Sequence, residues 1–66
     1  MNIVLACDNN FAPYAATVVA SILRNDKKVH FFILTDDMTS DNEHLLVSMT
    51  KDMGGFLDVV RVDGKL

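Results

Sequence analysis

The sequence predicts a small α/β unit in which three parallel strands alternate with two helices. Two apolar runs of strand length, residues 3–7 and 29–34, each lead into a polar loop and then into a segment with helical periodicity. A third strand-like run covers residues 56–62. Because helix-length segments separate the strands, the connections are long enough for parallel crossovers, and the fold class is α/β.

Composition and charge narrow the classes of protein that fit this chain. Half of its 66 residues are hydrophobic and 23% are charged, which is typical of a packed globular domain. The net charge of -3 argues against nucleic acid or an anionic membrane as a partner, because both require a basic surface. No apolar run reaches the ~20 residues of a transmembrane span. The single cysteine, Cys7, cannot form an internal disulfide, and we expect a cytoplasmic protein.

The first strand and the first helix follow from the amino-terminal third of the chain. Residues 2–7 are almost all apolar, which suits a strand covered on both faces in a parallel sheet. Pro13 suits the first turn of the following helix, where its missing N–H would be unpaired in any case. Helical spacing predicts that the buried side of this helix consists of Tyr14, Val18, Val19, Ile22 and Leu23.

The second helix is predicted between the second and third strands. Ser40 and Glu43 have the spacing of a capping box, which places the start of the helix at Ser40. Gly54-Gly55 suits its end, because glycine adopts the left-handed conformation that closes a helix. The apolar positions expected to face the core are Leu45, Leu46, Met49 and Met53.

We expect the strands to lie in the order 3-2-1, with the second strand between the first and the third. Right-handed crossovers then place both helices on one face of the sheet. Asp58 and Arg61 interrupt the third strand, as expected near a sheet edge. The other face stays bare, and the isolated segment should expose a surface for self-association. Residues 1–66 therefore indicate half of a Rossmann-like nucleotide-binding sheet, an incomplete portion of a larger domain.

The loop after the first strand is the strongest candidate for function, since ligands bind at the carboxyl ends of strands in open α/β sheets. Asp8 can accept a hydrogen bond from a nucleobase N–H, and Phe11 can stack on the base. Asn9 and Asn10 can bind ribose or base oxygens. No glycine precedes Gly54, which excludes a glycine-rich phosphate loop here. Alternatively, the polar residues form an Asx turn that caps the helix while Phe11 packs into the core.

Three stretches of the chain resemble the amino-terminal region of family 8 glycosyltransferases. They are residues 3–14 (IVLACDNNFAPY), residues 18–23 (VVASIL) and residues 30–34 (HFFIL). Members of this family are retaining enzymes of the GT-A fold, among them bacterial lipopolysaccharide galactosyl- and glucosyltransferases. The resemblance implies transfer of a hexose from a UDP-sugar to a saccharide or lipopolysaccharide acceptor.

By this resemblance, the UDP-sugar would be held by Ala6, Cys7, Asp8, Asn9, Asn10 and Phe11. The backbone of the first two would contact the uracil, the carboxylate would bind its edge, and the two amides would face the base and ribose. The aromatic ring would stack on the base. The family usually has tyrosine at the position of Phe11, so the stacking face is kept and one hydroxyl is lost.

The same resemblance implies a divalent metal, usually manganese, bound by an Asp-x-Asp motif downstream of this chain. Asp36-Asp37 is adjacent rather than alternating and follows the wrong strand, so we assign it to a solvated loop. Acceptor-binding residues of the family also lie beyond Leu66. We therefore assign no catalytic residue and no metal ligand to this chain, and we expect it to be inactive alone.

Two other functions remain open from the sequence. One is a receiver-like phosphoacceptor domain, in which Asp8 would join an acidic metal site and Asp63 would take the phosphoryl group; its first strand lies between the second and third. The other is a truncated, non-catalytic fragment that pairs with another chain. His30 and His44 have no visible partner and fit structural or surface roles.

Overall fold

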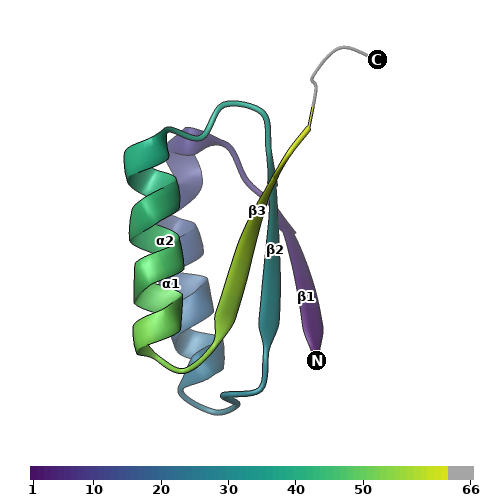
Figure 1. The fold of residues 1–66 in the computed structure, drawn as a ribbon, viewed down its shortest axis with the longest axis vertical. Helices are drawn as coiled ribbons and strands as arrows, with labels where there is room; N and C mark the ends of the chain where they lie inside the picture. The colour runs from purple at the N-terminus through teal and green to yellow at the C-terminus, as the bar shows by residue number, and fades with distance from the viewer. Residues whose placement is uncertain (63–66) are drawn as a thin grey trace.

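A computed structural model describes residues 1–62 as a sheet covered by a layer of helices (Figure 1). In chain order the elements are β1 (Asn2–Ala6), the 3-10 turn η1 (Asn9–Phe11), α1 (Ala12–Leu23), β2 (His30–Thr35), α2 (Ser40–Asp52) and β3 (Phe56–Arg61). The strands and the two α-helices are those expected from the sequence, and the strand ends differ by one residue. Neither of these helices is long and apolar enough to cross a membrane.

The three strands form one parallel sheet in which β2 lies between β1 and β3. The order β1-β2-β3 has the same neighbours as 3-2-1 read from the opposite edge. In the register, Ala6 lies beside Leu34 and Leu34 lies beside Val60. The carboxyl ends of all three strands therefore reach the same edge of the sheet. Figure 1 shows α1 and α2 on one side of the sheet.

The core lies between the sheet and the two helices. On β2, Phe31, Ile33 and Thr35 are buried, whereas the alternate residues of the strand are only partly covered. This alternation shows that the helices cover one face of the strand. The most deeply buried side chains are Phe31, Leu23, Ile33, Leu46, Val19, Val29 and Thr50.

The opposite face of the sheet carries apolar side chains that no other part of residues 1–62 covers. Val4 and Val60 are exposed there, and Phe32 lies between the strands that carry them. His30 shares this face, and its Nε2 lies 2.7 Å from Oδ2 of Asp58. Its ring also stacks on Phe32 with 4.3 Å between the centroids. His30 therefore has a partner that the sequence did not reveal, and this surface pair agrees with the structural or surface role expected of it.

The buried side of α1 differs from the predicted one. Ala12, Ala15, Val19 and Leu23 face the core, whereas the side chain of Tyr14 is 69% exposed. The sequence offers two adjacent stripes at helical spacing, and the one that begins with two alanines lies against the sheet. Small side chains at its start allow the helix backbone to approach the sheet closely.

α2 begins at Ser40, as predicted, but its N-cap differs from the predicted one. Thr39 is the N-cap residue, and its hydroxyl accepts a hydrogen bond from the backbone N–H of Asn42 at 3.3 Å. Glu43 forms an ion pair with Arg61 on β3. The predicted Ser40–Glu43 capping box is therefore wrong, because the cap lies one residue earlier and the glutamate turns to the sheet.

Two neighbouring leucines on α2 have opposite environments. Leu46 is 1% exposed and packs in the core, whereas Leu45 is 60% exposed, so its predicted burial is wrong. Met49 and Met53 pack against the core and are partly buried. Gly54 has φ +89°, which confirms the glycine stop predicted for this helix.

The leucine pair allows a matched test of this packing. Leu46→Ala should lower the free energy of unfolding by about 2–5 kcal/mol, because it leaves a cavity in the core. Leu45→Ala should change it by no more than about 0.5 kcal/mol, since that side chain is exposed. Urea denaturation followed by circular dichroism measures both variants. Equal losses in the two variants would contradict the orientation of α2.

Candidate functional site

The candidate site begins at the loop between β1 and α1, at the carboxyl edge of the sheet. Asp8 caps the η1 turn: its Oδ1 accepts a hydrogen bond from the backbone N–H of Phe11 at 3.1 Å. The same N–H also lies 3.1 Å from the Asp8 carbonyl oxygen. The capping part of the alternative interpretation is therefore correct for Asp8 alone, and the element it caps is η1; the N-cap of α1 is Phe11, which makes no side-chain capping hydrogen bond. Within residues 1–62, the other carboxylate oxygen of Asp8 has no hydrogen-bond partner.

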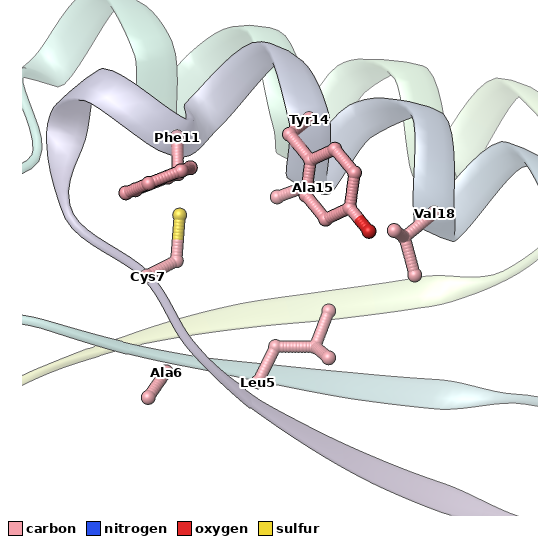
Figure 2. A pocket seen from close by; sticks show the side chains of 7 residues that line it. All are labelled: Leu5, Ala6, Cys7, Phe11, Tyr14, Ala15 and Val18. Atoms are coloured by element: carbon pink, nitrogen blue, oxygen red, sulfur yellow. The ribbon is translucent and has the colours of Figure 1, made fainter.

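The part of that interpretation that buries Phe11 is wrong. The Phe11 side chain is 59% exposed and borders a hollow of about 270 Å³ beside β1 and α1. Figure 2 shows the Cys7 sulfur directed toward the Phe11 ring, and Leu5 directed toward Tyr14 and Val18. The hollow is lined by Leu5, Ala6, Cys7, Phe11, Tyr14, Ala15 and Val18. An aromatic ring thus stands at the rim of an apolar depression.

The six predicted site residues divide into two groups. Ala6, Cys7 and Phe11 line the hollow, whereas the three polar residues between Cys7 and Phe11 do not. Of these three, Asp8 caps the turn, and Asn10 is exposed with no side-chain hydrogen bond to the rest of residues 1–62. The side chain of Asn9 instead forms hydrogen bonds with residues at the start of α2.

Asn9 connects the loop after β1 to the loop after β2. Its backbone N–H donates to Oδ1 of Asp37 at 2.9 Å. Its side-chain oxygen accepts from the backbone N–H of Thr39 and from Nδ2 of Asn42, both at 2.9 Å. Three hydrogen bonds therefore join segments about thirty residues apart.

A second set of contacts holds the loop after β2 in place. The hydroxyl of Thr35 lies 3.4 Å from Oδ1 of Asp37 and accepts from the backbone N–H of Met38 at 3.2 Å. Arg61, at the end of β3, donates to the carbonyl of Met38 at 2.8 Å and pairs with Glu43. Sequence reasoning missed these contacts; the only signal was that polar residues follow each strand.

Cys7 carries a thiol that stays protonated near neutral pH. Its Sγ donates a hydrogen bond to the Asp8 carbonyl at 3.1 Å. Burial raises the pKa of the Cys7 thiol, and the negative charges of Asp8 and Asp37 raise it further. A protonated thiol is a poor nucleophile and a poor metal ligand, so the geometry favours a packing role at the rim of the hollow.

The acidic residues of this edge do not assemble a metal site. Across residues 1–62, no group of three or more His, Cys, Asp or Glu side chains lies close enough to hold a metal ion. Asp37 already accepts the Asn9 N–H, and Asp36 is exposed in the loop. Asp37 therefore supports the loop, and the described residues do not fit the divalent metal that the resemblance implies.

Comparison with known families separates the glycosyltransferase from the receiver-like domain. Residues 2–66 match the family described as glycosyl transferase family 8. The chain belongs to this family. The family 8 chain also has β2 at the centre of its sheet, whereas a receiver-like domain has its first strand there. Asp63, the phosphoacceptor proposed for such a domain, lies outside the described residues.

Two solved structures resemble the family 8 chain. One is the galactosyltransferase LgtC in complex with donor and acceptor sugar analogues, and the other is an active-site mutant of LgtC. Each is 25% identical with a TM-score of 0.73, and the match covers 96% of this chain and 23% of the LgtC chain. The family 8 chain thus spans under a quarter of the length of LgtC. No curated protein matches it.

The raised thiol pKa predicts how stability changes with pH. In the unfolded chain Cys7 loses its proton near its ordinary pKa, about 8.5, while the folded chain still holds the proton. The unfolded state then binds fewer protons, so the free energy of unfolding should fall as pH rises from about 8.5 until the folded thiol ionises.

Urea denaturation of the wild type and Cys7→Ala at several values between about pH 7 and pH 10 measures this effect. The variant should lose less stability over the upper part of the range, and the difference between the two curves isolates the contribution of the Cys7 thiol. Parallel curves would show that the thiol pKa is not raised by folding.

Proposed function

We propose that this segment supplies the donor-nucleotide side of a glycosyltransferase that moves a hexose from a UDP-sugar to a saccharide or lipopolysaccharide acceptor. The observation that carries the proposal is the exposed ring of Phe11 at the rim of an apolar hollow. Phe11 is the last residue of η1, the turn that Asp8 caps. Family membership and the likeness to LgtC, a galactosyltransferase solved with donor and acceptor sugar analogues, support it.

The loop offers the groups that a uridine nucleotide requires. Phe11 presents a ring face on which the pyrimidine can stack, and stacking excludes water from the hollow behind it. The Asp8 oxygen that does not cap the turn can accept a hydrogen bond from the imide N–H of uracil. Asn10 is exposed beside it and can hydrogen-bond the ribose hydroxyls.

Ala6 and Cys7, the two residues before Asp8, offer backbone groups and part of the hollow to the base. The backbone N–H of Cys7 donates to the Leu34 carbonyl at 3.0 Å, so this group is committed to the sheet. Its carbonyl, and the backbone of Ala6 at the end of β1, are the groups that we propose contact the base. Both residues also line the hollow, which supports a contact with the edge of a stacked pyrimidine.

We assign the rest of the reaction to parts of a longer GT-A domain. We propose that the divalent metal is manganese and that residues outside 1–62 hold it, because the described residues contain no ligand cluster. The bare sheet face and the edge of β1 would be covered by further strands and helices. Without that cover we expect the isolated segment to be inactive and to self-associate, and we place the enzyme in the cytoplasm.

Asp8→Asn tests the proposed contact to uracil without removing the cap. The amide keeps an oxygen that can accept a hydrogen bond from the Phe11 N–H, but its NH₂ group cannot accept one from the N–H of the base. Calorimetric titration of UDP into the intact protein should show about 10- to 100-fold weaker binding for this variant.

Asp36→Asn is the matched control, because it removes the same charge from an exposed position in the neighbouring loop. It should leave UDP binding within about twofold of the wild type, since an exposed charge contributes little. If Asp8→Asn bound UDP as tightly as Asp36→Asn, the Asp8 carboxylate would not contact the base.

A further inference from the structure

Adjacent asparagines in residues 7–11, called the nucleotide loop below, have different surroundings. Asn10 is exposed, and its side chain makes no hydrogen bond to other parts of residues 1–62. Asn9 is partly buried, and its side-chain oxygen receives two donors, the backbone N–H of Thr39 and Nδ2 of Asn42. An amide oxygen has two lone pairs, so this oxygen is fully used inside the protein.

We propose that Asn9 is a positioning residue: through its side-chain oxygen it holds the nucleotide loop on the start of α2 and thereby orients Asp8 and Phe11. This inference rests on the proposed function, because the loop matters only if it binds the nucleotide. It deepens that function by separating the residue that braces the loop from those that contact the ligand.

The loop after β2, to which Asn9 is hydrogen-bonded, is itself held in place by other contacts. Asp37 accepts the Asn9 backbone N–H at 2.9 Å, and Thr35 lies beside Asp37 at the end of the central strand. Arg61 binds the carbonyl of Met38 at 2.8 Å, one residue before the N-cap of α2. The brace therefore connects the β1 loop to both of the other strand ends, and a loop anchored in this way loses little entropy when a ligand binds.

The two hydrogen bonds that the Asn9 oxygen accepts, called the brace here, can be distinguished by substitution from a contact between Asn9 and the ligand. Because the Asn9 oxygen is occupied, the ligand could use only its NH₂ group, which is a donor. Asn9→Asp keeps an oxygen for Thr39 and Asn42 but removes that donor. The new carboxylate also lies near the start of α2, where the helix dipole favours negative charge.

Asn42→Asp tests the brace from the other side. The substitution replaces the Nδ2 donor with an acceptor that repels the Asn9 oxygen, although Asn42 lies on α2 rather than on the nucleotide loop. A purely structural role of this hydrogen bond predicts that its loss lowers the free energy of unfolding, whereas the new carboxylate in the first turn of the helix offsets that loss. Weaker nucleotide binding with unchanged or increased stability is therefore specific to a positioning role.

UDP titration of the intact protein and urea denaturation, carried out on Asn9→Asp, Asn10→Asp and Asn42→Asp, form the test. We expect Asn9→Asp to bind UDP within about threefold of the wild type, and Asn42→Asp to bind it about fivefold or more weakly. Asn10→Asp is the matched control, in which an exposed amide donor is lost. The proposal is overturned if Asn9→Asp weakens binding as much as Asn10→Asp while Asn42→Asp leaves it unchanged.

Amide hydrogen exchange distinguishes failure of this inference from failure of the proposed function, because it needs no nucleotide. The Thr39 N–H should exchange about fivefold faster in Asn9→Ala and at nearly the wild-type rate in Asn9→Asp. Unchanged exchange in Asn9→Ala would show that the brace does not form. If UDP failed to bind the wild type, the proposed function would fall and the positioning role with it, even with the exchange pattern intact.

Discussion

The burial of one face of β2 is the constraint on which the rest of this structure depends. Phe31 and Ile33 are fully buried, and only helices packed on the same side of the sheet can cover them. Because β2 is also hydrogen-bonded to both neighbours, it fixes the register of β1 and β3 and brings three strand ends to one edge. The same arrangement leaves the other face open, with the His30–Asp58 pair as its polar element.

That edge is where the chain concentrates polar contacts. Each strand is followed by residues that bind another strand's loop: Asn9 after β1, Asp37 after β2, and Arg61 at the end of β3. These contacts give the loop after β1 a defined shape although it contains only one short 3-10 turn. Phe11 is exposed and Asp8 partly exposed, which suits the proposed role of this loop in binding a donor nucleotide.

The sequence predicted the elements of the fold, because these follow from local patterns, and it singled out the loop after β1 as the candidate site. Apolar runs, Pro13 and Gly54 mark strands and helix ends within a few residues. It could not select between two adjacent apolar stripes, so Tyr14 and Leu45 were expected in the core and are exposed. The role of Asn9 was also invisible, since its partners lie about thirty residues away and only the folded sheet brings them together.

The central claim is that Phe11 forms the platform for a uridine nucleotide, and ring NMR signals test it most directly. The intact protein, labelled at phenylalanine, is titrated with UDP; Phe56 is the internal control, because it is 67% exposed at the opposite end of the sheet. Stacking predicts saturable shifts of the Phe11 ring signals, from the ring current of the base, with Phe56 unchanged. Phe11 signals that stay fixed at saturating UDP, or that move no more than those of Phe56, would contradict the account.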